Sequence, residues 1–410
     1  MNIVKTITRL SVVALLLCSA NTLSMELSPQ TKEKIQGALE SYRVANNITG
    51  AQLSVSLPSY EHSDSIATFY SGYTTTENLT PIGSLLESSN EKVDLLSIGS
   101  ITKSFITAVI LQLDKEKKLS TNDKLSQYFP DYPDWGNVTI KELLNMTSGI
   151  APYMDTTQYE SAPPTTQWTK RKLVDLAYNN IQPNRCSNVG GNTCFTPGTS
   201  WFYSNTNTNL AGLIIEKVTG KTLKQELELR LLGKHSKLHA LSSTFFVPDG
   251  DSAKIYKRMV HEYDENDRIT DYTSFNLSWA RAGGAMVSNS RDLVRWGRLL
   301  FNTNKVIPKS EFNDFTMLHC IDENSTRYTK PINRVSAQCN IGFGLNIMQM
   351  RMPDGNVVWG YEGDWPGIQA QFWYLPNTDI VVSLQQDTGK HGELPADIMT
   401  LFKQIYKYLN

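Results

Sequence analysis

The sequence has no excess charge of either sign and no low-complexity tract. Its 410 residues contain 39 Lys and Arg against 40 Asp and Glu, a net charge of −1. This balance argues against a basic groove for nucleic acid and against a polybasic patch for a membrane surface. Apolar residues make up 40% of the chain, which excludes a disordered or fibrous protein. The length fits two or three domains of about 150 residues, or one large domain.

Long apolar runs are also missing. The run Leu10–Cys18 is about half as long as a membrane-spanning helix requires. Lys5 and Arg9 precede it and small residues follow it, an order that is typical of a secretory signal. We therefore expect residues 1–24 to be a signal peptide, the mature protein to be periplasmic or secreted, and no segment to span a membrane. Cys18 leaves a lipoprotein as the alternative.

Cysteine is scarce. Four cysteines remain after the predicted signal peptide, and an even number in an exported chain suggests disulfides. Three pairings are possible, and the short separations favour two local bridges, Cys186–Cys194 and Cys320–Cys339. Four free thiols in a reducing compartment are the alternative. The chain has no Cys-x-x-Cys pair, so a zinc site is not expected.

Several common functional motifs are missing or incomplete. Gly220 precedes Lys-Thr as in a phosphate-binding loop, but Ile215 stands where that loop needs glycine. His235 and His239 are four residues apart, with no acidic residue between them and no third ligand nearby in the sequence. The Gly-x-Ser-x-Gly elbow of α/β-hydrolases does not occur. We therefore expect neither a nucleotide site nor a metal site.

Helical and strand patterns divide the chain into a mixed start, a helical middle and a β-rich end. We expect helices over Ser28–Asn46, Ser100–Leu113, Lys141–Met146, Lys170–Asn179, Thr206–Val218, Leu223–Leu232 and Leu394–Leu409. We expect strands over Ala51–Leu57, Ser65–Tyr70, Asn356–Tyr361, Gln369–Leu375 and Asp379–Leu384. This order predicts an α+β fold, an antiparallel sheet flanked by the N- and C-terminal helices, with an inserted, mostly helical subdomain. Residues 25–410 would form one catalytic unit, with an α/β lobe of about 25–114 and 292–410 and a helical lobe of about 115–291.

Ser100 and Lys103 open a strongly apolar segment. Seven of the nine residues from Phe105 to Leu113 are apolar, which is typical of a buried helix. Its first turn would carry a hydroxyl and an amine three residues apart on one face. A buried lysine is costly unless it is paired or neutral, and a neutral amine is a candidate general base for Ser100. The alternative is that Ser100 only caps the helix.

Tyr203 and Asn205 lie directly before the helix expected at Thr206–Val218. A tyrosine held in such a turn could relay a proton between Ser100 and a leaving group. Asn205 could hydrogen-bond a substrate amide. The alternative is a helix cap with a packed tyrosine.

A Gly-rich segment, Gly360–Gly367, follows the last residues of the strand expected at Asn356–Tyr361. Gly363 would let a substrate backbone approach closely. The backbone amides of Ser100 and Asp364 could together form an oxyanion hole. The alternative is an ordinary Gly/Pro turn.

Taken in order, these motifs resemble the serine β-lactamase and penicillin-binding-protein-like hydrolases, especially class C β-lactamases, D-Ala-D-Ala carboxypeptidases and related esterases. Ile98-Gly-Ser-Ile-Thr-Lys-Ser-Phe105 is similar to their Ser-x-x-Lys element and Tyr203-Ser-Asn205 to their Tyr-x-Asn. Gly360-Tyr-Glu-Gly363 stands where they have Lys-Thr-Gly or His-x-Gly. The stretches 139–149 and 282–292 also match, and the resemblance covers most of residues 28–410.

The resemblance implies acyl transfer through Ser100, with Lys103 and Tyr203 sharing the base and acid roles and with no metal or organic cofactor. It leaves open which of the two is the base. Asn205, Tyr361 and Gly363 would contact the substrate. Expected partners are a small molecule or a peptide, such as a peptidoglycan stem peptide, an ester or a β-lactam.

The third motif departs from the family pattern. Tyr361 stands where relatives that bind a substrate carboxylate usually have Lys or His, and a phenol carries no positive charge. If Glu362 points into the cleft, it would repel a substrate carboxylate and favour a neutral ester or a substrate with a free amine. Strand alternation predicts that Tyr361 and Gly363 share one face and that Glu362 faces away.

Three functions follow. The first is an exported D-Ala-D-Ala carboxypeptidase that acts on cell-wall peptides. The second is an esterase, D-aminopeptidase or β-lactamase on the same fold. The third is a non-catalytic binding protein that has kept the fold.

Overall fold

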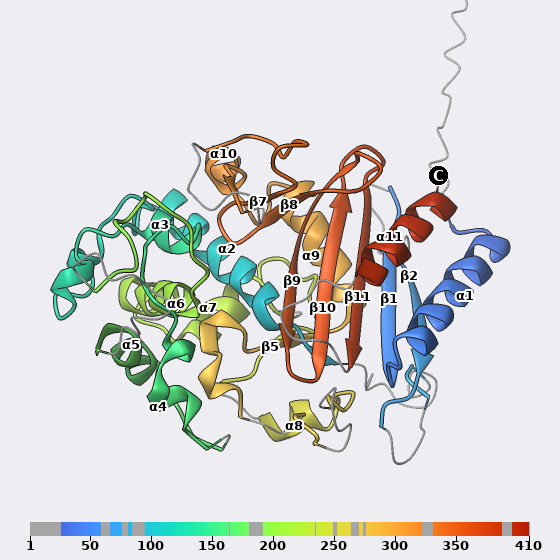
Figure 1. The fold of residues 1–410 in the computed structure, drawn as a ribbon, viewed down its shortest axis with the longest axis horizontal. Helices are drawn as coiled ribbons and strands as arrows, with labels where there is room; N and C mark the ends of the chain where they lie inside the picture. The colour runs from blue at the N-terminus through green and yellow to red at the C-terminus, as the bar shows by residue number, and fades with distance from the viewer. Residues whose placement is uncertain are drawn as a thin grey trace, which may run out of the picture.

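The computed structural model describes residues 26–58, 66–75, 81–83, 95–163, 165–179, 192–233, 235–248, 252–263, 270–273, 276–321, 331–387 and 396–409. The predicted signal peptide at 1–24 lies outside these residues. A large sheet stands beside a group of helices, as Figure 1 shows. The N-terminal and C-terminal helices, α1 and α11, pack side by side at one end of the molecule.

The large sheet has eight antiparallel strands in the order β2-β1-β11-β10-β9-β8-β7-β6. A second sheet has the order β3-β5-β4. The strands of the large sheet are β1 Gly50–Ser56, β2 Ile66–Gly72, β6 His319–Cys320, β7 Ile341–Phe343, β8 Met348–Arg351, β9 Val357–Trp365, β10 Ile368–Leu375 and β11 Ile380–Asp387. Those of the small sheet are β3 Leu96–Ser97, β4 Phe245–Phe246 and β5 Met286–Ser288. The first strand therefore pairs with the last one, and both ends of the chain build one sheet.

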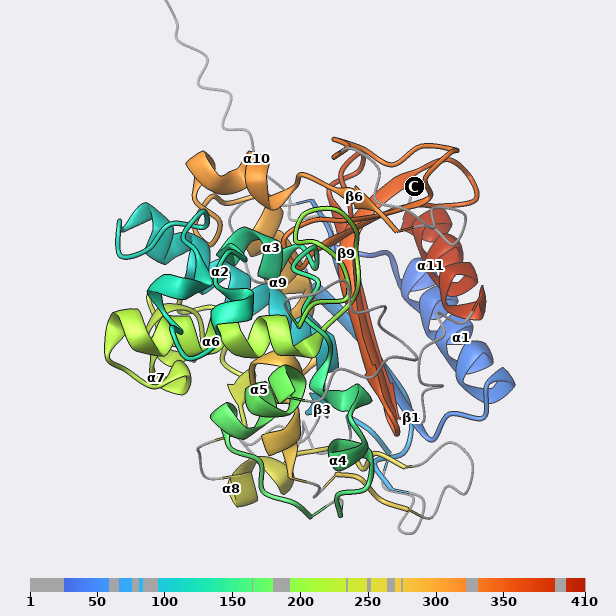
Figure 2. The ribbon, with the colours of Figure 1, turned by 60° about the vertical axis from the view of Figure 1, so that its left-hand side comes forward.

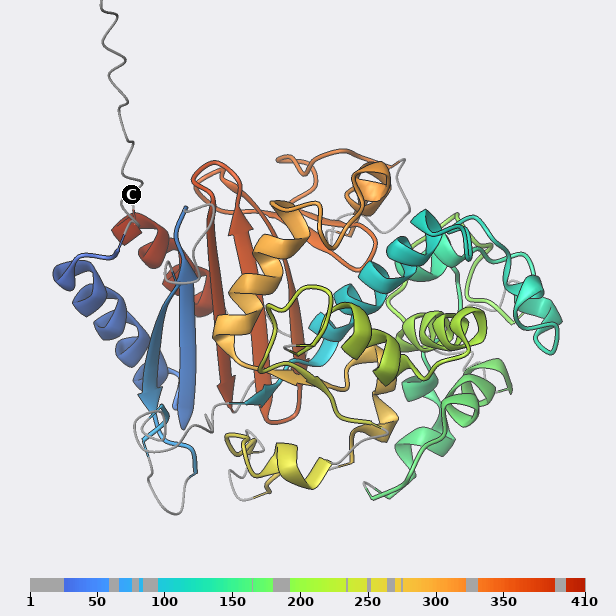
Figure 3. The same ribbon diagram turned by 180° about the vertical axis from the view of Figure 1, so that it is seen from behind.

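Helices cover both faces of the large sheet. Figure 2 views the sheet almost edge-on, with α1 and α11 on one side and α9 on the other, and Figure 3 shows α9 lying across the strands from behind. The helices are α1 Pro29–Ala45, α2 Thr102–Lys115, α3 Ile140–Leu144, α4 Thr157–Glu160, α5 Lys170–Asn179, α6 Asn205–Thr219, α7 Leu223–Arg230, α8 Ser252–Tyr256, α9 Ser290–Phe301, α10 Phe312–Phe315 and α11 Ala396–Leu409. Helices α3, α5, α6 and α7 gather away from the sheet.

Helix α2 lies at the centre of the molecule, and most of its residues are buried. Its apolar sequence allows this, because nearly every side of the helix meets another element. Phe105 stacks on Trp296 of α9, with ring centroids 3.7 Å apart. This contact fixes α2 against the helix that covers the large sheet.

Local sequence signals fix several helix ends. Ser28 caps α1 by accepting a hydrogen bond from the Thr31 amide at 3.1 Å, and Pro29 occupies the first helical position. Helix α6 ends at Gly220, whose φ of 68° is the left-handed conformation that favours glycine. Both ends agree with the sequence prediction, as does the exact span of α5, Lys170–Asn179.

Strand β9 corrects one prediction. We expected the strand Asn356–Tyr361 to end in the Gly-rich segment Gly360–Gly367, for which an ordinary turn was the alternative, but β9 continues to Trp365, which pairs with Ile368. Only Pro366 and Gly367 form the turn, where Gly367 has a φ of 98°. Glycine is needed at position 360 of this strand, because a Cβ there would lie 2.0 Å from the Phe372 carbonyl oxygen and no larger residue fits.

The predicted α+β architecture is confirmed, with an antiparallel sheet flanked by the terminal helices. Helix α9 and strands β6, β7 and β8 were not predicted individually. The limits of the two lobes stay a prediction.

Candidate active site

Ser100, Lys103 and Tyr203 meet at one point. The Lys103 Nζ atom donates a hydrogen bond to the Ser100 Oγ atom at 2.9 Å, and the Tyr203 hydroxyl donates to the same oxygen at 2.6 Å. Lys103 also donates to the backbone carbonyl of Gly283. Its Nζ atom lies 4.9 Å from the centroid of the Tyr203 ring. The predicted trio is therefore assembled around a single hydroxyl oxygen.

The local fold explains this convergence. Gly99, with a φ of 45°, begins a short 3-10 turn over Gly99–Ile101 that runs directly into α2. Ser100 and Lys103 consequently share one face of the first turn. Tyr203 precedes α6, and its ring packs edge-on against Phe343 of β7, with centroids 6.5 Å apart. The large sheet thus orients the tyrosine toward the serine.

Burial sets the protonation states of the two groups that flank Ser100. Lys103 is fully buried, and burial lowers the pKa of its amine to about 7, although the negative charge of Asp364 acts in the opposite direction. Burial raises the pKa of the Tyr203 phenol above its usual value. At neutral pH a large fraction of Lys103 is therefore an uncharged amine, while Tyr203 keeps its proton.

Strand β9 presses directly on the turn that carries the serine. A Cβ on Gly363 would lie 2.1 Å from the Ile98 carbonyl oxygen and 2.5 Å from the Ser100 amide nitrogen. A Cβ on Gly99 would lie 3.0 Å from the Asp364 amide nitrogen. The amides of Ser100 and Asp364, which we predicted to form an oxyanion hole, thus belong to two backbone segments in direct contact.

This contact corrects the prediction for Gly363. We expected the missing side chain to make room for a substrate backbone. The space is filled by the turn at Ile98–Ser100, and Gly363 is not among the residues that line the pocket. Glycine is required at this position because two parts of the protein backbone come too close for a Cβ atom.

A pocket of about 600 Å³ opens beside the trio. Aromatic rings form much of its wall, and three carboxylates border it. The lining includes Ser100, Tyr203 and Asn205, the aromatic residues Tyr159, Trp168, Trp201, Tyr272, Trp279, Phe343, Tyr361 and Trp365, and the acids Glu160, Glu362 and Asp364. No Lys, Arg or His is among these described lining residues. The pocket therefore suits apolar groups and opposes a negative charge.

Tyr361 and Asn205 border this pocket as predicted. The Tyr361 side chain is only 1% exposed, and its hydroxyl lies beside that of Tyr203. The Asn205 amide donates to the Met154 sulfur at 2.9 Å, a weak acceptor that a substrate carbonyl could replace. Both polar groups are thus available to a bound molecule.

Glu362 also borders the pocket, although strand alternation predicted that it faces away from Tyr361. Strand β8 pairs with β9 from Val357 to Gly360, so beyond this point the edge of β9 borders the pocket instead of another described strand. Burial, reinforced by the neighbouring Asp364, raises the pKa of the Glu362 carboxyl to about 8. A second residue of the unusual third motif is therefore within reach of a ligand.

Sequence reasoning missed most of the pocket wall. Trp201, Trp279 and Trp365 come from three distant segments, and nothing in the local sequence marks them as neighbours. Gly283, whose carbonyl holds Lys103, lies in the stretch 282–292 that contributed to the resemblance. Only that family pattern could have indicated a role for it.

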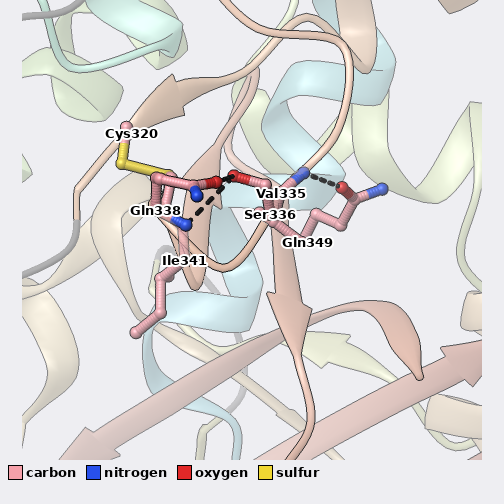
Figure 4. Close-up of a disulfide and its surroundings, with 7 residues drawn as sticks. Cys320, Val335, Ser336, Gln338, Ile341 and Gln349 are labelled. Carbon is pink, nitrogen blue, oxygen red and sulfur yellow. Dashed lines mark hydrogen bonds between the residues drawn. A yellow bond between two sulfur atoms is a disulfide. The ribbon is translucent and has the colours of Figure 1, made fainter. Parts of the chain in front are cut away.

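The predicted disulfide between Cys320 and Cys339 is confirmed, with a Cα–Cα distance of 5.9 Å (Figure 4). Close to it, the Val335 amide donates to the Gln349 side chain at 2.7 Å. Ile321, which follows Cys320, and Phe343 in β7 both line the pocket. This disulfide therefore lies at the edge of the site. Cys186 lies outside the described residues, and its bridge to Cys194 stays a prediction.

Comparison with protein families identifies the chain. Residues 94–398 match the family model described as Beta-lactamase. The chain belongs to the Beta-lactamase family. Penicillin-binding protein 4* of Bacillus subtilis (strain 168) is 24% identical over 338 residues, which cover 76% of this chain and 66% of that protein. Protein flp of Staphylococcus aureus (strain MRSA252) is 28% identical over 210 residues, which are 50% of this chain and 38% of that protein.

Solved structures of other Beta-lactamase-like proteins share the fold. A D-stereospecific amidohydrolase from Streptomyces sp. has a TM-score of 0.66 at 25% identity, covering 92% of this chain and 97% of that one. The D-amino acid amidase from Ochrobactrum anthropi SV3, complexed with L-phenylalanine amide, has a TM-score of 0.73 at 22% identity and covers 93% and 98%. The chain thus shares its fold with these two proteins over almost its whole length. Within the described residues of this Beta-lactamase family member, no helix has both the length and the apolar character needed to cross a bilayer.

Proposed function

We propose that this protein hydrolyses amides or esters through an acyl-enzyme on Ser100. The Ser100 Oγ atom attacks the substrate carbonyl carbon while the neutral Lys103 amine takes its proton. Tyr203 donates its proton to the leaving group and regains one from Lys103, so that the lysine is neutral again. The amides of Ser100 and Asp364 stabilise the oxyanion, and water then releases the acyl group by the reverse sequence.

One observation supports this mechanism above all. The Lys103 Nζ atom and the Tyr203 hydroxyl both lie within hydrogen-bond distance of the same Ser100 oxygen, at 2.9 and 2.6 Å. A helix cap would not need a buried lysine beside it, and a packed tyrosine would not need its hydroxyl on the serine. The arrangement weighs against the non-catalytic alternative, since a binding protein gains nothing from burying an amine next to a hydroxyl.

The pocket favours substrates that have no carboxylate beside the bond to be cleaved. Its described lining carries three acidic residues and no cationic side chain, although the Glu362 carboxyl, with a pKa of about 8, is mostly protonated at pH 7. Lys103 lies beside the pocket and, with a pKa of about 7, is about half neutral at that pH. Two unit charges of like sign about 4 Å apart repel by ~1 kcal/mol in water and by more inside a cleft. We therefore infer an amidase or esterase activity, with aromatic or aliphatic acyl groups. Amino-acid amides, the compounds named for the structural relatives, are the first substrates to test.

A D-Ala-D-Ala carboxypeptidase is the second candidate, and the Tyr361 hydroxyl is the observation that favours it. This hydroxyl borders the pocket beside Tyr203 and could donate to a substrate carboxylate. The similarity to Penicillin-binding protein 4* also supports this candidate.

The first test is covalent labelling with a fluorophosphonate, with Ser100→Ala as the control. We expect the wild type to gain one label on Ser100 and the alanine variant to gain none. Equal labelling of both proteins would show that the nucleophile is another residue, and no labelling of either would favour the non-catalytic alternative.

A substrate panel then separates the two activities. D-phenylalanine amide, a short acyl ester and a D-Ala-D-Ala peptide are supplied at equal concentration. We expect turnover of the amide or the ester to exceed release of D-Ala by more than about tenfold. Faster release of D-Ala would establish the carboxypeptidase instead.

We also infer that the protein is exported to the periplasm or secreted. The basic and apolar residues at the start of the chain support this, as does the Cys320–Cys339 disulfide, because disulfides persist in oxidising compartments. Edman sequencing of the mature protein from the periplasmic fraction would locate the cleavage site, and recovery of the intact chain from the cytoplasm would contradict the inference.

A further inference from the structure

A buried carboxyl group outside the catalytic trio holds the strand that leads to Ser100. Glu262 is fully buried. Its Oε1 atom accepts a hydrogen bond from the Ser97 backbone amide at 2.7 Å, and its Oε2 atom lies 3.1 Å from the Ser97 hydroxyl. Ser97 is the last residue of β3 and stands three positions before Ser100.

The Glu262 side chain continues a short series of backbone hydrogen bonds between two neighbouring segments, where its carboxyl replaces a backbone carbonyl as the acceptor. The Leu95 amide donates to the Arg258 carbonyl at 3.0 Å, and the Val260 amide donates to the Leu95 carbonyl at 2.9 Å. The next amide of β3 on this side belongs to Ser97, and it is the Glu262 carboxyl that accepts from it. Without this carboxyl a buried backbone donor directly before the nucleophile turn would lose its partner.

The backbone of Glu262 supports another part of the pocket. The Tyr272 amide donates to the Glu262 carbonyl at 2.7 Å, and the Tyr272 side chain lines the pocket. A Cβ on Gly367, in the turn after β9, would lie 3.2 Å from the same carbonyl oxygen. Glu262 thus connects three parts of the site: strand β3 before Ser100, the pocket wall at Tyr272, and the turn that follows β9.

Glu262 is suited to this place because it keeps its proton. Burial raises the pKa of its carboxyl to about 8, opposed by the hydrogen bonds from Ser97 and reinforced by the negative charges of Asp271 and Asp387. The Asp271 carboxylate lies 2.6 Å from the His261 ring. One carboxyl oxygen accepts from the Ser97 amide and the other accepts from the Ser97 hydroxyl, which can instead accept when the group opposite it is a donor. A glutamine amide has the same shape and the same donor and acceptor.

We propose that Glu262 is a positioning residue that fixes the backbone at Ser97 and thereby the place of Ser100 against β9. This role depends on the proposed function, since it takes Ser100 as the nucleophile. Strand β9 packs so closely on this turn that a Cβ on Gly363 would lie 2.5 Å from the Ser100 amide nitrogen. A shift of β3 therefore displaces Ser100 relative to the Asp364 amide, and a misplacement of ~1 Å can cost about 100-fold in rate.

The test compares Glu262→Ala with Glu262→Gln, using the substrate that the wild type turns over fastest. We expect the alanine variant to lose roughly 10- to 100-fold in kcat while KM changes less than about threefold, because the pocket that binds substrate stays in place. We expect the glutamine variant to stay within about threefold of wild type, because it restores both hydrogen bonds. The rate of Ser100 labelling by a fluorophosphonate, followed by intact-protein mass, should change in parallel.

Leu227→Ala is the matched control. Leu227 is fully buried in α7 and does not line the pocket, so its truncation lowers stability without touching the site. We expect its kcat to remain near that of wild type at a temperature where the variant is folded. If Glu262→Ala loses no more kcat than Leu227→Ala, or if the glutamine variant loses as much as the alanine variant, Glu262 has no positioning role.

Should the alanine variant fail to fold, Glu262→Asp replaces it. Aspartate is one methylene shorter, so we expect it to lose kcat while glutamine retains it, and equal kcat for these two variants would overturn the proposal. The labelling control separates this result from failure of the proposed function. Equal labelling of wild type and Ser100→Ala would reject the nucleophile itself, whatever the Glu262 variants do.

Discussion

The Lys103 amine nitrogen lies 2.9 Å from the Ser100 hydroxyl oxygen, and the same nitrogen donates to the Gly283 carbonyl. Because the lysine is fully buried, this short contact joins a nucleophile to an amine that loses its proton far more easily than an exposed lysine. Several measurable consequences follow from this pair and from the segments packed around it.

The rate of acylation should rise with pH through about 7. Burial lowers the pKa of Lys103 from 10.5 to about 7, and only the neutral amine accepts the serine proton. Stopped-flow measurement with a neutral acyl ester from pH 5 to pH 9 should give a sigmoidal rise. We choose a neutral ester because a substrate without charge is attracted or repelled little when Glu362, whose pKa is about 8, loses its proton. A flat profile would contradict Lys103 as the base.

Stability should respond to the same group. Between about pH 7 and pH 10.5, Lys103 carries a proton in the unfolded chain but not in the folded chain. The free energy of unfolding therefore increases with pH over this range. The cost of burying Lys103 is full at pH 7 and below and disappears near pH 10.5. We expect Lys103→Met to raise Tm most at pH 6 to 7 and progressively less toward pH 10, as measured by calorimetry. A Tm difference that does not vary with pH would contradict the shifted pKa.

Gly363→Ala should damage the site, whereas Gly37→Ala should not. The new methyl group at position 363 would overlap the Ile98 carbonyl and the Ser100 amide, while a Cβ on Gly37 in α1 has nothing within 4 Å. We expect a loss of roughly 1–3 kcal/mol in stability and about 100-fold in kcat for Gly363→Ala. For Gly37→Ala we expect a gain of about 0.5–1 kcal/mol. Urea titration and steady-state kinetics measure both, and a fully active Gly363→Ala variant would refute the packing explanation.

Tyr361→His should shift selectivity toward substrates with a carboxylate. Tyr361 borders a pocket that, in the described residues, offers no cationic lining side chain, so a protonated histidine adds the missing charge. At pH 6 we expect kcat/KM for an acidic substrate to improve roughly tenfold relative to a neutral one. Tyr361→Phe is the control, because it removes the hydroxyl without adding charge. Equal effects on both substrates would reject a role for charge at this position.

Removing the Cys320–Cys339 disulfide should cost stability. The two cysteines are 19 positions apart, and closing a loop of this length stabilises by ~3 kcal/mol in the chain-entropy description. We expect Cys320→Ser with Cys339→Ser to lower the midpoint of urea unfolding and to loosen the pocket edge at Ile321. An unchanged midpoint would show that the surrounding sheet holds this edge without the covalent link.

Local sequence signals were sufficient to predict a helix end wherever one residue determines the backbone conformation there. Ser28, Pro29 and Gly220 mark helix ends by their own chemistry, and the structure places those ends where expected. The trio could be predicted because its motifs occur in the order of a known family. The spacing of Ser100 and Lys103 on one helix face and the place of Tyr203 before a helix were compatible with it, but each alone left a helix cap as the alternative.

Other features depend on contacts that no short window of sequence contains. The glycines and acids of β9 are typical of a turn, yet pairing with β10 extends the strand to Trp365. Helix α9 is a different case, because its sequence does carry local signals that were overlooked: Asn289 caps it, and Leu293, Trp296 and Leu300 recur at helical spacing on its buried face. Glu262 carries no local sign of its role, since its partner Ser97 is 165 positions away in the chain.

Because β1 pairs with β11, the large sheet cannot be completed until the end of the chain has been synthesised. The nucleophile, the phenol that contacts it and the strand that supplies the second oxyanion amide come from residues 100, 203 and 364, and β11 follows only at Ile380–Asp387. A polypeptide still emerging from a ribosome or a translocation channel therefore lacks part of the catalytic machinery until nearly all of it has passed. We expect fragments that end before Asp364 to be inert, so that the proposed activity arises only when synthesis is almost finished.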